Sequence, residues 1–173
     1  MNKTILTMLI IFLIFGVTQV NANSVVKPPD YNKIIKESDY VFIGFPIEEG
    51  KTKKINEASM ITVWEIMPYI TLKGNLNRNE ILLRTSGGSI NEVVLPGVNL
   101  KIDKMYIFLL KRSEDPFLWD TVNDDEVSIR PVKKIEYNIG ENVIQFENIE
   151  LVNALDNYIK NSKLNKYKIR EVK

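Results

Sequence analysis

The chain of 173 residues contains no cysteine and no histidine. Without cysteine there can be no disulfide bond, no thiol nucleophile and no lipoprotein-type lipid anchor. Without histidine the commonest general base, the Ser-His-Asp arrangement and the usual zinc and copper sites are excluded as well. An enzyme would have to rely on carboxylates, Lys, Tyr, Mg²⁺ or Ca²⁺, and no residue spacing points to any of these. We therefore expect a non-catalytic protein that needs no cofactor.

The chain also has no large excess of positive or negative charge. The chain has 23 Lys and Arg residues against 22 Asp and Glu residues. Proteins that bind nucleic acid need a basic surface that neutralises phosphates. The balanced charge gives no electrostatic reason to expect a nucleic-acid partner.

The first 22 residues have the pattern of a secretory signal peptide. Lys3 supplies the positive start, residues 5–17 form an apolar core, and Ala22 ends a short segment suited to cleavage. The alternative is an uncleaved membrane anchor, although the core is shorter than the ~20 residues that span a bilayer. We predict a secreted or extracytoplasmic protein associated with the cell envelope.

The rest of the chain has about the length of one domain. We predict a single domain over residues 23–163 and a basic tail over residues 164–173, in a monomeric protein. From Lys160 to Lys173 there are six basic residues and one acid. Such a tail is typical of a solvated terminus, or of a segment that touches anionic polymers or lipid headgroups. Membrane contact is expected only through this tail or an uncleaved signal.

Residues 59–89 carry the clearest β-strand pattern. Met60 to Leu72 is rich in β-branched and aromatic residues, which predicts one long strand. Pro68 cannot donate a ladder hydrogen bond, and the apolar residues change face around it, so we predict a bulge or bend there. Ile81 to Thr85 predicts a second strand, which ends at Gly87 and Gly88. A long, curled strand favours a small barrel over a flat sheet.

Five short motifs occur in an order that resembles a group of exported bacterial domains. They are Ser38-Asp39-Tyr40-Val41-Phe42-Ile43-Gly44, Leu72-Lys73-Gly74, Thr85-Ser86-Gly87-Gly88, Leu95-Pro96-Gly97 and Met105-Tyr106-Ile107-Phe108-Leu109-Leu110. The resemblance covers roughly residues 34–112 and implies an OB-like barrel similar to that of the tissue inhibitors of metalloproteinases. Ser86 stands where the group has Pro, and Asp103-Lys104 stand where it has Gly-Glu. The cysteines on which those inhibitors depend are absent, so protease inhibition does not carry over.

The remaining segments complete a mainly β protein. A short helix capped by Asp30 is expected near the N-terminus, and an amphipathic helix from Asn148 to about Lys163 is expected to pack on the barrel. Other expected elements are strands at 40–47, 90–95, 105–110, 127–132 and 135–139, a solvated loop at 48–58, and a solvated acidic turn, or a calcium site, at 120–126.

The residue types suggest a binding role at the bacterial cell envelope, with an envelope protein or glycan as partner. OB-like barrels present aromatic side chains on exposed strands for stacking, and Trp64, Tyr69 and Trp119 are the candidates here, with Arg84 as a polar donor. For each of these aromatic residues, a place in the core is the first expectation, and a stacking role is the alternative. Two alternatives are a carboxylate- or divalent-metal-dependent hydrolase that uses Asp120 and Asp124, and a structural envelope protein held by the basic tail.

Overall fold

The computed structural model describes residues 27–76, 79–115, 117–138, 140–164 and 166–172, so the predicted signal peptide lies outside the described residues. The elements are α2 (Tyr31–Glu37), β1 (Tyr40–Pro46), β2 (Lys51–Asn56), β3 (Ser59–Lys73), β4 (Ile81–Ser86), β5 (Gly88–Ile90), β6 (Val93–Leu95), β7 (Tyr106–Arg112), β8 (Leu118–Thr121), α3 (Asp125–Ser128), β9 (Ile129–Pro131), β10 (Lys134–Asn138), β11 (Glu141–Phe146), α4 (Ile149–Asn161) and β12 (Tyr167–Glu171). In this described part, no helix has the length and apolar character needed to cross a membrane.

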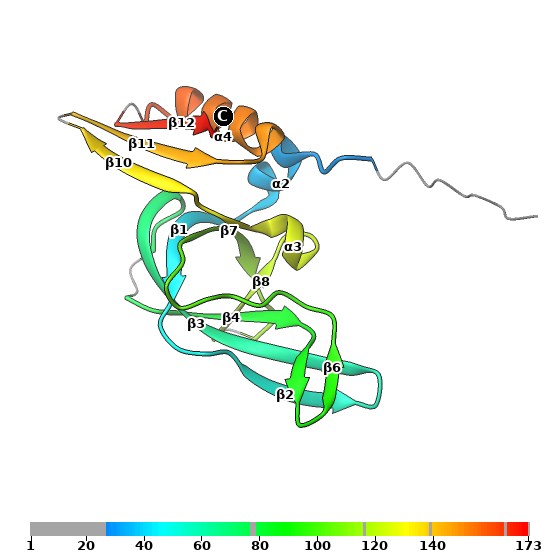
Figure 1. The fold of residues 1–173 in the computed structure, drawn as a ribbon. Helices are drawn as coiled ribbons and strands as arrows, with labels where there is room; N and C mark the ends of the chain where they lie inside the picture. The colour runs from blue at the N-terminus through cyan, green and yellow to red at the C-terminus, as the bar shows by residue number, and fades with distance from the viewer. Residues whose placement is uncertain (1–26, 77–78, 116, 139, 165, 173) are drawn as a thin grey trace, which may run out of the picture.

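Five strands close into a barrel in the order β1-β3-β4-β8-β7, with β7 pairing back onto β1 (Figure 1). All these pairings are antiparallel except that of β4 with β8, which is parallel. The predicted mainly β fold is confirmed, with an OB-like barrel, a short helix near the N-terminus and a C-terminal helix.

The two central strands of the barrel, β1 and β7, are buried on both faces, because each has apolar residues at successive positions. Phe42 and Phe108 point into the barrel, where their rings stack with centroids 5.1 Å apart. The alternate residues point outward into a second apolar cluster, which they share with α2 and α4. They are Val41, Ile43, Ile107 and Leu109.

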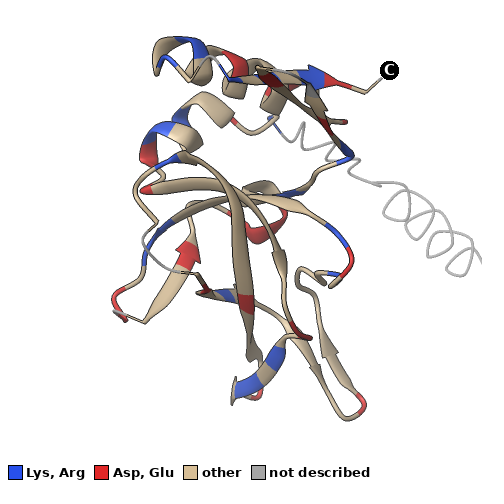
Figure 2. Cartoon of the chain, turned by 90° about the vertical axis from the view of Figure 1, so that its left-hand side faces the viewer, with Lys and Arg blue, Asp and Glu red and all other residues tan. Residues whose placement is uncertain are grey.

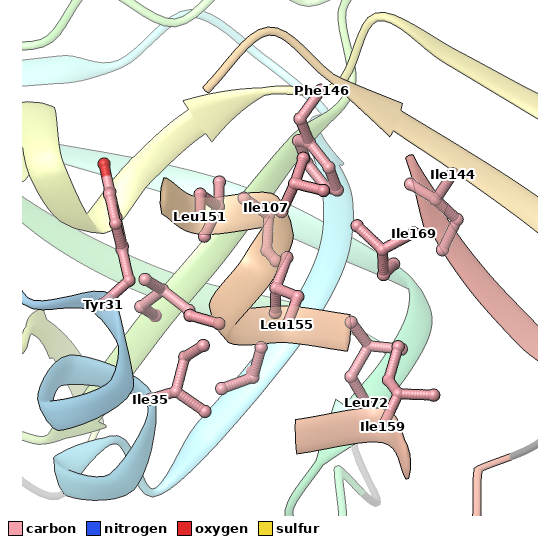
Figure 3. Packing of buried hydrophobic residues seen from close by; sticks show 14 of the residues in the cluster. Tyr31, Ile35, Leu72, Ile107, Ile144, Phe146, Leu151, Leu155, Ile159 and Ile169 are labelled. Atoms are coloured by element: carbon pink, nitrogen blue, oxygen red, sulfur yellow. The ribbon is translucent and has the colours of Figure 1, made fainter. Parts of the chain in front are cut away.

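A C-terminal layer covers that outward face. The strands β11 and β12 are parallel and are joined through α4, while β10 lies antiparallel on the other side of β11. The side chain of Asn148 caps α4 by accepting a 2.7 Å hydrogen bond from the backbone N–H of Leu151. The predicted apolar stripe of this helix, including Leu151, Leu155 and Ile159, is buried against α2 and the barrel (Figure 3).

The long strand β3 bends where the sequence predicts it. In the pairing with β1, Ile43 lies opposite Ile70 and Gly44 opposite Pro68, so Tyr69 is left without a partner. This is a β-bulge next to Pro68, as predicted. The bulge increases the local bend of the strand and turns Tyr69 away from the barrel core.

Two of the five motifs, Thr85-Ser86-Gly87-Gly88 and Leu95-Pro96-Gly97, contact each other through their glycines. Gly87 has φ +77°, and a Cβ added there would lie 1.9 Å from the carbonyl oxygen of Pro96. Gly97 is similarly confined, because its added Cβ would lie 2.2 Å from the carbonyl oxygen of Ser86. The two backbones therefore touch directly, and neither position has room for a side chain.

Three predicted segments were wrong. The expected loop at 48–58 contains β2, which extends the antiparallel pairing along β3. The expected strand at 90–95 is a β5–β6 hairpin that turns at Asn91, which has φ +55°. The strand expected at 127–132 is present only as β9 (Ile129–Pro131). Its first two residues belong to the short helix α3, where Asp125 is anchored to β4 by hydrogen bonds from Ser86.

The predicted basic tail is also wrong as a description of residues 167–171. The segment forms β12, which pairs with β11 along its length, and Ile169 is buried in the cluster beneath α4. Its alternating pattern, with Tyr167 and Ile169 on one face and Lys168 and Arg170 on the other, is typical of a half-buried strand.

The contact between the glycine turns can be tested with two alanine substitutions. We expect Gly87→Ala to lower the free energy of unfolding by more than ~2 kcal/mol, because it combines a positive-φ cost with overpacking against Pro96. Gly140 is the matched control, since it has φ +84° but nothing within 4 Å of an added Cβ. Gly140→Ala should cost only ~1 kcal/mol. If urea unfolding shows that Gly87→Ala and Gly140→Ala lower the free energy of unfolding equally, the crowding at Gly87 is contradicted.

The role of β12 can be tested in the same assay. Ile169→Ala removes a buried side chain and should lower the free energy of unfolding by about 2–4 kcal/mol. Val172→Ala, at an exposed position directly after β12, should change it by less than ~0.5 kcal/mol. A negligible effect of Ile169→Ala would show that residues 167–171 behave as a free tail.

Candidate functional site

Trp64 belongs to the barrel core. Its side chain is 5 % exposed, and its indole N–H donates a 3.0 Å hydrogen bond to the hydroxyl of Thr85. Gly50 lies directly over the ring, because a Cβ added there would come within 2.7 Å of it. The polar edge of Trp64 is thus satisfied inside the protein and its face is covered, so it offers no stacking surface.

Trp119 is placed in the same core. It is 9 % exposed and meets Tyr40 edge to face, with ring centroids 4.5 Å apart. The two tryptophans line separate surface clefts, of about 610 Å³ at Trp64 and about 430 Å³ at Trp119. Both tryptophans therefore pack in the barrel core, which is one of the two roles considered from the sequence.

Arg84 is held by an acidic partner. Its guanidinium donates two hydrogen bonds to Asp120, of 2.8 Å from Nε and 2.7 Å from Nη2, and a third of 3.2 Å to the hydroxyl of Ser113. The hydrogen bonds to Asp120 raise the pKa of Arg84 above its usual value. Arg84 and Asp120 are also register partners in the parallel β4–β8 pairing, so the ion pair bridges that seam. Both halves are partly exposed, so its contribution to stability is small.

The acidic segment 120–126 is organised by hydrogen bonds within the protein. Asp125 accepts from the backbone N–H and hydroxyl of Ser86, at 2.7 and 2.8 Å, and from the hydroxyl of Thr121, at 2.7 Å. Asp124 stands at the N-cap of α3. Among the described residues, no three acidic side chains gather as a metal-binding set. The hydrolase that would use Asp120 and Asp124 stays a prediction, and both oxygens of Asp120 are engaged by Arg84.

Tyr69 differs from the other candidates, because it is exposed. It lies in the bulge of β3, is 51 % exposed, and accepts a 2.6 Å hydrogen bond from the hydroxyl of Tyr137 on β10. Tyr137 is itself 59 % exposed. The pair therefore joins the barrel to the C-terminal layer at the surface, where the β10–β11 hairpin reaches over the curled end of β3 (Figure 1).

Two further polar residues continue this row across the C-terminal sheet. Tyr137 pairs with Asn142 on β11, and Asn142 pairs with Tyr167 on β12, so the three side chains share one face. Strands lie ~4.8 Å apart, which gives the row a width of about 10 Å before Tyr69 extends it. Lys166 lies over the ring of Tyr167, with Nζ 5.0 Å from the centroid. We call Tyr69, Tyr137, Asn142 and Tyr167 the tyrosine strip.

Sequence reasoning missed three of these four residues. Tyr167 was assigned to the tail, Tyr137 was placed on the strand expected at 135–139, and Asn142 was assigned to no element. The segment Tyr137-Asn138-Ile139-Gly140-Glu141 contains Asn and Gly between two apolar runs, which is a hairpin signal. A hairpin turning there would have put Tyr137 opposite Asn142.

The contact between the two phenols changes the acidity of Tyr137. Removal from water and the hydrogen bond to Tyr69 both favour the neutral phenol, and they raise the pKa of Tyr137 from 10.0 to about 12. The neutral form is thus favoured in the folded state. Any stabilisation from this contact is complete below pH ~10 and is lost as the pH rises toward ~12.

In comparisons with known proteins, no family model matches the chain and no curated protein matches it. The resemblance to exported bacterial OB-like domains therefore stays a prediction.

The tyrosine contact can be measured by following phenolate absorbance near 295 nm as the pH is raised. We expect one tyrosine of the wild-type protein to titrate near pH 12, and Tyr69→Phe to lower that pKa, because the hydroxyl that accepts the hydrogen bond is gone. Tyr158→Phe, which removes a tyrosine from α4 instead, should leave the late titration in place. A late titration that keeps its midpoint in Tyr69→Phe would contradict the contact.

Proposed function

We propose that the protein is an exported, non-catalytic domain of the bacterial cell envelope that binds a glycan through the tyrosine strip. The observation that carries the proposal is the pair formed by Tyr69 and Tyr137, two exposed aromatic side chains held together by their hydroxyls. Exposed tyrosines are usually scattered singly on a protein surface, and a contiguous pair favours a binding surface.

The chemistry of the strip suits a sugar. The apolar C–H faces of a pyranose stack on aromatic rings, and its hydroxyls need donors and acceptors at the ring edges. Because Tyr137 donates to Tyr69, the Tyr69 hydroxyl keeps its own proton available for a ligand. The amide of Asn142 adds both a donor and an acceptor in the same row.

The strip is also rigid. Its residues stand on β3, β10, β11 and β12. Ile144 and Ile169, the next residues on the same face of β11 and β12, are buried in the core and anchor these two strands. A surface that is ordered before the ligand arrives avoids part of the entropy cost of binding. A sheet that presents aromatic rings in fixed positions is therefore a better binding surface than a loop would be.

The export and the absence of catalysis are supported by the sequence. The predicted signal peptide directs the chain out of the cytoplasm, and an exported chain without cysteine needs no oxidising compartment to fold. A glycan-binding role requires none of the histidine or thiol chemistry that the chain lacks.

The proposal is tested by retention on isolated bacterial envelope material. The mature protein should bind a cell-wall preparation, and Tyr69→Ala and Tyr137→Ala should each weaken the apparent affinity by about tenfold, because each removes a central aromatic contact. Phe117→Ala is the matched control, because Phe117 is 68 % exposed but lies on the loop before β8. It should bind as the wild type does.

Two results would contradict the proposal. Retention that survives both tyrosine substitutions would place the binding surface elsewhere. Retention that disappears when the wall preparation is treated with protease would identify a protein partner in place of a glycan. Circular dichroism of each variant confirms that the loss does not come from unfolding.

A further inference from the structure

Two lysines lie at one end of the tyrosine strip. Lys163 follows the end of α4, and Lys166 directly precedes β12, so both stand in the short connection beside Tyr167. Both are exposed, and Lys166 is positioned over the Tyr167 ring. Basic residues also occur at the opposite end of the molecule, on β2, well away from this layer (Figure 2).

Most other basic residues of the C-terminal layer are neutralised by acidic partners. Lys160 pairs with Asp156, and Lys168 pairs with Glu141 at 2.6 Å. Arg170 lies close enough to Glu136 to help lower the pKa of that carboxyl, after the larger effect of Lys134. Within the described residues, Lys163 and Lys166 form no such ion pair. Their positive charge is therefore available at the end of the strip.

The backbone at Lys163 is unusual. It has φ +57°, in the left-handed region, and the N–H of Leu164 donates a 3.2 Å hydrogen bond to the carbonyl of Ile159. This is the Schellman geometry that ends many helices, in which glycine is strongly preferred at the position of Lys163. A lysine is less stable there than glycine, because its Cβ crowds the backbone. A lysine at a position where glycine would be more stable indicates that the lysine side chain has a function.

We propose that the tyrosine strip binds an acidic glycan, whose sugar rings lie on the exposed Tyr69 and Tyr137 and whose anionic group pairs with Lys163 and Lys166. This inference rests on the proposed function and specifies the class of ligand. The anionic group is a carboxylate or a phosphate, since both pair with lysine ammonium groups. The rings supply the contact area, and the two lysines select charged polymers over neutral ones.

The experiment uses one bacterial cell-wall preparation in three forms. The first is untreated, the second has its carboxylates amidated, and the third has been treated with hydrofluoric acid to remove phosphodiester-linked polymers. Binding of the mature wild-type protein should fall at least tenfold on the second or third form. Which treatment lowers the affinity identifies the carboxylate or the phosphate.

Lysine variants separate this inference from the proposed function. Lys163→Gly and Lys166→Gln should each weaken binding to the untreated preparation by about fivefold and make binding less sensitive to salt. Lys163→Gly should also raise the midpoint of urea unfolding, since glycine suits the left-handed position. Loss of binding in a more stable protein cannot be explained by unfolding. Lys53→Gln and Lys54→Gln on β2 are the matched controls and should bind normally.

Each outcome decides one of the two statements. If all three forms bind equally and the lysine variants bind as the wild type does, the acidic ligand is excluded while tyrosine-dependent binding stands. If the control variants on β2 weaken binding as much as Lys163→Gly and Lys166→Gln do, the effect is non-specific attraction and the inference is overturned. If no form binds the wild type, the proposed function fails with it.

Discussion

The antiparallel pairing of β1 with β7 is the constraint on which the rest of the structure depends. It closes the barrel, and because both strands are apolar on both faces, it creates two cores at once. Phe42 and Phe108 point into the barrel from one face of these strands. Ile43 and Ile107 point away from it on the other face and pack in the cluster that contains α2 and α4. Each buried side chain of this size contributes ~1.5–3 kcal/mol, so the pairing stabilises both layers together.

The glycine turns determine how tightly the barrel ends can close. Gly74 has φ +83° and lies against Tyr40, and Gly87 lies against Pro96. In both places, one turn packs directly on a backbone or ring from a distant part of the chain. Short motifs that are separate in the sequence therefore contact one another in the fold. The glycine of each motif has no side chain, so a distant segment can pack directly against it.

The binding surface that we propose exists only where the two layers meet. Tyr69 comes from the bulge of the barrel strand β3, and Tyr137 comes from the C-terminal sheet, so neither layer alone forms the pair. The interior aromatic residues serve a different purpose, since Trp64 and Trp119 hold the barrel together. Some aromatic residues of this small domain are therefore buried and others are exposed, depending on the strand face on which each one lies.

Local pattern was enough to predict the mainly β composition, the bend at Pro68, the cap at Asp30 and the apolar stripe of α4, because each depends on residues close together in the chain. Composition alone predicted the lack of disulfides and of histidine chemistry. Tertiary structure decided that residues 167–171 form a strand, because a parallel strand needs its partner β11 to supply the hydrogen bonds. It also decided that Trp64 is buried and Tyr69 exposed, since periodicity gives the side of a strand but not what covers that side. The contact of Tyr69 with Tyr137 joins residues far apart in the chain, and only the docking of the C-terminal layer on β1 and β7 brings them together.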